Sequence, residues 1–211
     1  MIEIYVGVDP SINSSGIACL AYEDGVKLSE KFYIIKSEKL TKKETLAEEK
    51  NVNIFEYYVY NRLQPKDKEN NHEVEYYKTL SAIEVMESIL LCIKKFISQV
   101  TYPHGIYELY ICQEGISYGS VTRTKSVFDL AGLNYLLRNM IIKYLKPSYF
   151  IIATPSEIKK ITSGNGNCKK EIMSNLFKSI YTTLDLPKID DVADAYWMQN
   201  YIKILKDNHQ I

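Results

Sequence analysis

The sequence has no excess of either charge. Its 211 residues include 26 Lys and Arg and 26 Asp and Glu, so the formal net charge is zero. This balance excludes a positive field over the whole surface, which would attract nucleic acid wherever it approached. Any site for a polyanion must therefore be a local cluster of basic side chains.

Long apolar runs and paired cysteines are missing as well. No apolar stretch approaches the ~18 residues that suggest a membrane-spanning helix, and the start lacks the basic-then-apolar pattern of a secretion signal. The four cysteines have no CxxC spacing of the kind found in zinc and redox sites (Cys19, Cys92, Cys112 and Cys168). These absences predict a protein with reduced cysteines in the cytoplasm, or in the host cell cytoplasm if the protein is viral.

Hydrophobic residues make up 46% of the chain, which is enough to bury a sizeable core. No repeat or linker divides the sequence, so we expect one domain over residues 1–211. Residues 37–78 are the least regular part. They begin in a charged run at residues 36–50, continue with a β-branched and aromatic stretch at residues 52–60 that could add a strand, and end in a polar loop at residues 65–73.

The other segments predict three strands followed by alternating helices and strands. Apolar residues alternate from Ile2 to Val8, as in a strand with one buried face, and Asp9-Pro10 ends that strand. We expect strands at residues 2–9, 17–22, 26–35, 109–112 and 149–153, and helices at residues 79–100, 126–145, 169–184 and 191–205, the last capped by Asp190. The order predicts an α/β domain with a mixed sheet of five strands flanked by helices.

Acidic residues fall where several of these elements begin or end. Asp9 ends the first strand, Glu114 ends the fourth, and Asp191 and Asp194 lie one turn apart at the start of the last helix. Each has an ordinary alternative. Asp9 could form an ordinary turn or a phosphate-binding turn of the kinase type. Glu114 could be a solvated residue at a strand end, and the two aspartates could simply stabilise a helix N-terminus. Their joint position at the sheet ends favours a common site.

The chemistry of these side chains indicates which ion such a site would bind. Hard oxygen ligands without His or Cys select Mg²⁺ or Mn²⁺. Two such ions about 4 Å apart can activate water and stabilise the leaving oxygen in phosphodiester cleavage. Lysines also flank a glycine turn, Gly164-Asn-Gly166, which suits a backbone that approaches phosphates closely. A solvated basic loop is the alternative for that segment.

Taken together, the motifs resemble those of RuvC-type Holliday-junction resolvases, which have an RNase H-like fold. The resemblance rests on Gly7-Val-Asp9-Pro-Ser, on Gln113-Glu114 at a strand end, on Asp191-Val-Ala-Asp194-Ala, and on the lysine and Gly-x-Gly segment at residues 158–171. It covers most of the chain except residues 37–78. Composition and the loop at residues 114–119 look more like bacteriophage or viral members than cellular ones.

The resemblance implies a function and a role for each matching residue. It implies a structure-selective DNA endonuclease that uses two Mg²⁺ or Mn²⁺ ions per active site and resolves four-way junctions by paired symmetric nicks as a homodimer. By position, the metal ligands would be Asp9, Glu114, Asp191 and Asp194, and Lys170 would lie near the scissile phosphate. Further DNA contacts would come from Tyr118, Arg123, Lys125, Lys159, Lys160 and Lys169. Tyr118 departs from the bacterial pattern, which usually has Phe one residue nearer the glutamate.

Two other functions fit the same motifs. One is a different RNase H-like DNA nuclease, of the terminase or debranching type, and the other is a non-catalytic YqgF-like nucleic-acid-binding module. Four converging carboxylates favour an enzyme, because a pure binding module has no use for them. The predicted helix at residues 126–145 carries apolar residues around more than one stripe, so we expect Leu136 and Met140 to face a second copy of the chain.

Overall fold

The structure, a computed structural model, describes residues 1–62, 64–103, 105–115 and 124–211, with only the backbone at residues 124–128. A single sheet of six strands runs through it, in the order β4-β3-β2-β1-β5-β6. The strands are β1 (Ile2–Asp9), β2 (Ser14–Glu23), β3 (Val26–Lys36), β4 (Phe55–Val59), β5 (Tyr107–Glu114) and β6 (Tyr149–Ala153). The sheet is mixed: β2 runs antiparallel to β1 and β3, and the other neighbouring pairs are parallel.

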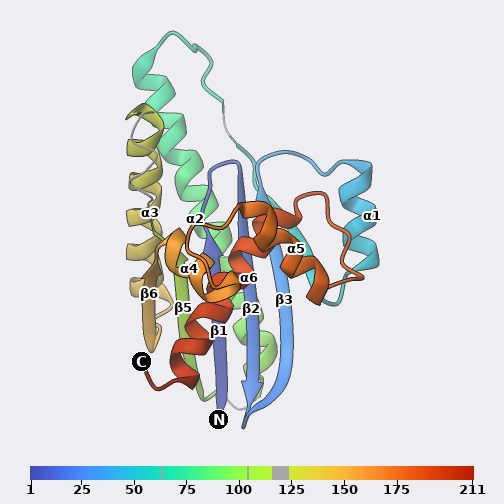
Figure 1. Ribbon diagram of the computed structural model, residues 1–211. Coiled ribbons are helices and arrows are strands. Elements are labelled where there is room, and N and C mark those ends of the chain that lie inside the picture. The colour runs from blue at the N-terminus through green and yellow to red at the C-terminus, as the bar shows by residue number, and fades with distance from the viewer. Residues whose placement is uncertain (63, 104, 116–123) are drawn as a thin grey trace.

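Helices lie on both faces of the sheet (Figure 1). They are α1 (Lys42–Lys50), α2 (Asn71–Thr101), α3 (Thr124–Tyr144), α4 (Pro155–Ser163), α5 (Lys170–Ile180) and α6 (Ile189–Asp207). Residues of α2 and α3 form one core cluster with the side chains from Ile2 to Val8 that alternate along β1. Residues of α4, α5 and α6 form the second cluster, on the face to which Tyr5 points. The predicted alternation in the first strand is therefore confirmed, but β1 is buried on both faces and not on one.

The predicted mixed α/β sheet flanked by helices is confirmed, but the number of strands was wrong. The sixth strand, β4, lies in the least regular part of the sequence and pairs in parallel with β3 at the edge of the sheet. A parallel neighbour needs a crossover, which α1 supplies. The helix α1 begins with a capping box in which Thr41 and Glu44 bond each other's backbone N–H groups.

Several helices differ from the sequence prediction, and one of them is α5, which ends at Ile180 and not at residue 184. Asn70 caps α2 because its side-chain oxygen accepts hydrogen bonds from the backbone N–H groups of His72 and Glu73, so α2 starts eight residues earlier than expected. Asp190 is not the cap of α6, because that helix begins one residue before it, and its carboxylate instead accepts a hydrogen bond from Ser174 Oγ at 2.5 Å. The fourth helix, α4, was not predicted, although Thr154 and Glu157 form a capping box there with proline at the first helical position.

All four cysteines are buried and unbonded. Within the described part of the chain, none of the helices has the length and the apolar character that a membrane crossing requires.

Candidate active site

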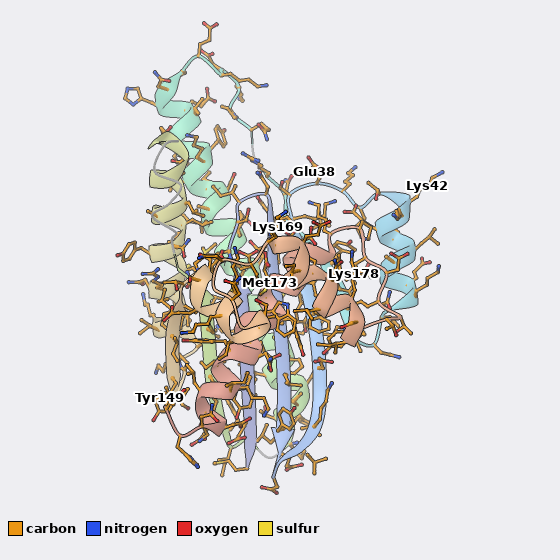
Figure 2. All side chains as sticks on the ribbon, viewed as in Figure 1. Glu38, Lys42, Tyr149, Lys169, Met173 and Lys178 are labelled. Atoms are coloured by element: carbon orange, nitrogen blue, oxygen red, sulfur yellow. The ribbon has the colours of Figure 1, made fainter. Side chains whose placement is uncertain are left out.

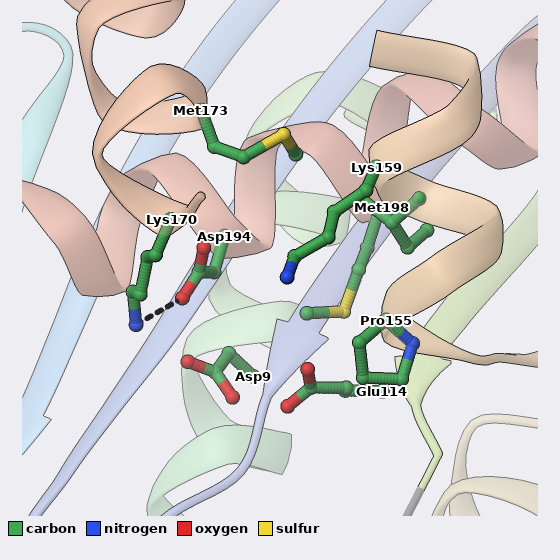
Figure 3. A pocket seen from close by; sticks show the side chains of 9 residues that line it. Asp9, Glu114, Pro155, Lys159, Lys170, Met173, Asp194 and Met198 are labelled. Carbon is green, nitrogen blue, oxygen red and sulfur yellow. Dashed lines mark ion pairs between the residues drawn. The ribbon is translucent and has the colours of Figure 1, made fainter. Parts of the chain in front are cut away.

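The pairing of two strands brings the first two acidic residues to one edge of the sheet. The strands β1 and β5 are parallel neighbours, with Val8 opposite Gln113, so Asp9 and Glu114 follow at the same level. The β1 strand ends there because Pro10 cannot donate a ladder hydrogen bond. Both carboxylates are partly buried, and Figure 3 shows them facing the same hollow.

The other two acidic residues reach this edge because α6 lies directly on the sheet. A side-chain carbon at Gly7 would lie 1.9 Å from the carbonyl oxygen of Ala195, and one at Gly16 would lie 2.0 Å from that of Asp191. Only glycine permits so close an approach of helix and strand backbones. These two glycines were not predicted as site residues, although a glycine inside a strand is a known sign of such an approach.

A cavity of about 280 Å³ opens between the strand ends and the three helices of this face. Three of the four predicted carboxylates line it, together with two lysines and an apolar wall. The lining residues are Asp9, Glu114, Asp194, Lys159, Lys170, Pro155, Ile158, Met173 and Met198. Figure 3 shows Lys159 and Lys170 pointing into the space from different helices. The apolar wall was not predicted from the sequence.

The Lys170 ammonium forms an ion pair with Asp194 at 2.5 Å. Burial alone lowers the pKa of Lys170, but the hydrogen bond to Asp194 and the charges of Asp194, Asp9 and Asp191 outweigh it, so its pKa is raised. This lysine opens α5 and its side chain is 57% exposed, so water or a ligand can reach it. In the structure it is the counter-ion of the acidic cluster.

Burial and mutual repulsion disfavour charge on the carboxylates. The pKa of Asp9 is raised well above its ordinary value, first by burial and then by the negative charges of Glu114 and Asp194. Burial also raises the pKa of Glu114, against the opposing effects of its hydrogen bond with Asp9 and the charges of Lys170 and Lys159. Burial likewise raises the pKa of Asp194, although Lys170 opposes the change. The three carboxylates of the cavity thus outnumber its two ammonium groups.

Asp191 lies beside the cavity but does not line it. Its Oδ2 accepts a hydrogen bond from Ser14 Oγ, at the start of β2. Its charge still acts on the site, because it contributes to the raised pKa values of Lys170 and Asp194. Ser14 was not predicted as a site residue, since its contact spans 177 positions of sequence.

The donor set fits a hard divalent cation. It consists of carboxylate oxygens on rigid elements, with no histidine or cysteine in the cavity lining. Among the described residues, no three His, Cys, Asp or Glu side chains already converge as a compact ligand group. The ion pair explains part of this arrangement, because Lys170 now engages the Asp194 oxygen that a cation would need.

The predicted DNA-binding residues divide into three groups. Lys159 lines the cavity, whereas Lys160 and Lys169 are exposed and lie outside its lining. Figure 2 shows Lys169 at the surface near the start of α5. Tyr118 and Arg123 lie outside the described residues, and so does the side chain of Lys125.

A tight turn joins α4 to the segment before α5. Gly164 ends α4 with a φ of 77°, and a side-chain carbon at Gly166 would lie 2.5 Å from Ser156 Oγ. The left-handed backbone at Gly164 and the close approach at Gly166 both favour glycine here. The turn connects the two helices that carry Lys159 and Lys170.

Comparison with solved structures identifies this arrangement of strands and helices. The chain is similar to the Thermus thermophilus RuvC structure, with a TM-score of 0.53, 14% identity, and 99% of this chain and 97% of that chain covered. It is also similar to T. thermophilus RuvC in complex with Holliday junction substrate, with a TM-score of 0.51, 12% identity, and 99% and 96% covered.

The chain has the fold of RuvC. The resemblance predicted from the motifs is therefore confirmed at the level of the fold. The yeast mitochondrial Holliday junction resolvase Ydc2 also matches, with a TM-score of 0.39, 14% identity, and 97% of this chain and 84% of that chain covered. No protein-family model and no curated protein matches the sequence.

Proposed function

We propose that this protein is a metal-dependent, structure-selective DNA endonuclease that resolves four-way junctions by paired symmetric nicks. The observation that carries the proposal is the cavity in which Asp9, Glu114 and Asp194 face Lys159 and Lys170 at one edge of the sheet. A structure of the same fold is described as RuvC in complex with Holliday junction substrate, which supports branched DNA as the substrate.

Asp9, Glu114 and Asp194, with Asp191 beside them, would hold Mg²⁺ or Mn²⁺, and we propose two ions per site. Bound ions would supply an activated water and charge stabilisation at the leaving oxygen. The raised pKa values of Asp9 and Glu114 support this role, because they come from burial and from repulsion between carboxylates, and a bound cation would relieve both effects.

The lysines would bind and orient the phosphodiester. When a cation takes over the Asp194 carboxylate, the Lys170 ammonium is released from its ion pair and can donate to a phosphate oxygen. A donor held at that oxygen stabilises negative charge that grows in the transition state. Lys159, on the opposite side of the opening, would hold the same phosphate or its neighbour. The apolar side chains of Met173 and Met198 would limit the access of bulk water.

Paired nicks require two active sites, so we propose a homodimer. The outer surface of α2 and α3 is the proposed interface. Leu136 and Met140 are partly buried against their own core, which makes them poorer probes of a dimer than the sequence predicted. Leu91, which is 50% exposed and lines a groove together with Met140, is a better one.

The test is a labelled four-way junction compared with a linear duplex of the same sequence, with and without Mg²⁺, with both cut strands mapped. The expected result is a symmetric pair of nicks in the junction, only when the metal is present, and little cutting of the duplex. Binding of the junction without cleavage at any divalent metal concentration would favour the non-catalytic module. Equal cutting of other branched or linear DNA would favour the alternative nuclease.

A further inference from the structure

A second group of basic side chains lies beyond the turn between β1 and β2, in the segment that carries none of the motifs. The chain leaves β4 and returns to the edge of the sheet that bears Asp9. Tyr60 donates a hydrogen bond through its hydroxyl to the carbonyl oxygen of Ile12 at 2.6 Å, and Arg62 Nη1 donates to Asn13 Oδ1 at 3.1 Å. Ile12 and Asn13 form the turn between β1 and β2, so this segment is anchored within a few residues of Asp9.

The segment and the first turns of α2 enclose a cavity of about 260 Å³. In Figure 1 the segment rises from the sheet to the start of α2, beyond the ends of the strands. Three cations line the cavity and no acidic residue does. The lining consists of Arg62, Gln64, Pro65, Lys68, Val74, Tyr77, Lys78 and Ser81, which we call the α2 basic pocket.

The positive charge of the α2 basic pocket is only partly neutralised. Lys78 bonds Glu75 at 2.9 Å and lies 3.4 Å from Asp129, so its charge is balanced. In the described part of the chain, Arg62 and Lys68 form no ion pair with an acidic residue. Two cations thus remain available for an anionic ligand.

Two acidic residues of the same segment, Glu73 and Asp67, have other partners. Glu73 accepts hydrogen bonds from the backbone N–H groups of Lys66 and Asp67, at 3.0 and 3.1 Å. Asp67 in turn accepts one from the backbone N–H of Glu69 at 2.9 Å. These bonds fold the loop and use its carboxylates inside it. Although the segment contains residues of both charges, the charged side chains that line its pocket are all positive.

We propose that the α2 basic pocket is a second binding site for the phosphodiester backbone of DNA, distinct from the site of cleavage. This inference rests on the proposed function and extends it to a strand that passes the active site. The planar guanidinium of Arg62 keeps N–H groups at Nε and Nη2 beside the one that bonds Asn13, and these can bond two phosphate oxygens. The flexible ammonium of Lys68 can bond a third. Tyr77, Pro65 and Val74 provide apolar walls for the sugars on either side of the phosphate.

The position of the pocket explains why the segment would help the enzyme. Contacts to phosphates fix the register and orientation of DNA without reading its sequence. A contact anchored to the β1–β2 turn would hold a junction arm at a fixed place relative to Asp9. Because the chain has no net charge, such local contacts must supply the electrostatic attraction for DNA.

The test compares two lysines of the same loop in an Asp9→Asn background, in which DNA is expected to be bound but not cut. Lys68→Gln removes a cation from the pocket, and Lys66→Gln removes one from an exposed position outside the lining. Both side chains are exposed, so neither change is expected to affect folding. Affinity for a labelled four-way junction is measured from low to moderate salt for each variant and for the background protein.

The expected result is a weaker affinity for Lys68→Gln and a log–log salt slope shallower by about 0.9, the value for one lost phosphate contact. Lys66→Gln should keep the slope of the background protein. Junctions with single methylphosphonate replacements should contain one position, away from the cut, that weakens binding of the background protein but not of the Lys68→Gln variant. Equal slopes for the two lysine variants would overturn the inference.

Failure of the second site can be distinguished from failure of the proposed function. If the wild-type protein neither binds nor cuts four-way junctions, the proposed function itself fails. If it does both while the two lysine variants bind alike, only the second site fails. A titration with inorganic phosphate, followed by thermal shift, tests whether the pocket binds a free anion and not DNA. Saturable binding of phosphate that depends on Lys68, with junction affinity unchanged, would contradict a DNA site.

Discussion

The glycine at position 7 offers the sharpest test of how the site is built. In Gly7→Ala the new carbon would lie 1.9 Å from the carbonyl oxygen of Ala195 and 2.5 Å from the backbone nitrogen of Gln199. Real contacts of this kind are essentially never under 3.0 Å, so α6 and β1 must separate by at least about 1.1 Å. Both clashing atoms belong to the backbone of α6, and no side chain can rotate away.

Two effects of different size should follow. Overpacking of a close-packed interior costs about 1–3 kcal/mol, and the upper end applies here because a whole helix must move. A protein of this size has roughly 5–15 kcal/mol of stability, so the variant should still fold. The same displacement moves Asp194 away from Asp9 and Glu114, and a misplacement of about 1 Å at a catalytic centre costs on the order of 100-fold in rate.

Urea unfolding measures the first effect, and single-turnover cleavage of a four-way junction in Mg²⁺ measures the second. Gly132→Ala is the matched control, because a carbon there meets no atom within 4 Å. That glycine lies inside α3, so alanine should stabilise the helix by up to about 1 kcal/mol and leave cleavage unchanged. Wild-type stability and wild-type cleavage in Gly7→Ala would refute the close contact between α6 and β1.

Four other substitutions test the remaining parts of the proposal. Because the pKa of Asp9 is raised, its contribution to stability in metal-free protein is lost as pH rises from its ordinary pKa through the raised value. Asp9→Asn should therefore flatten this pH dependence and raise the midpoint of thermal unfolding at neutral pH in EDTA, while abolishing cleavage; an unchanged midpoint would argue against a strained carboxylate. Lys170→Ala should raise the barrier of the chemical step by about 2–4 kcal/mol with a smaller loss of junction affinity, and Lys159→Ala should have a milder effect. A single-turnover rate of Lys170→Ala equal to that of the wild-type protein would show that Lys170 takes no part in the reaction. Leu91→Glu should yield a monomer by sedimentation that makes single, asymmetric nicks, and a monomeric wild-type protein that resolves junctions would disprove the dimer.

Much of the fold could be predicted because its signals are local. Alternation along β1 and the amphipathic helices depend on neighbouring residues, so these elements exist where the sequence placed them, although several of their ends differ. The α4 helix also had a local signal, the Thr154 and Glu157 capping box. It was not predicted, because the segment was interpreted from the lysines and glycines that follow. The strand β4 was foreseen only as an option, because its pairing with β3 depends on a crossover.

The candidate site also has features that the sequence indicates and features that depend on tertiary packing. The order of the motifs by itself determined which carboxylates and lysines to consider, because each is tied to the end of a predictable element. Only the tertiary structure decided how they are used: Lys170 neutralises Asp194, while Asp191 bonds Ser14 and stays outside the cavity. These contacts join residues far apart in the sequence, and their geometry is set by the packing of α5 and α6 on the sheet. No periodicity or spacing encodes that packing, because it depends on the backbones meeting at Gly7 and Gly16.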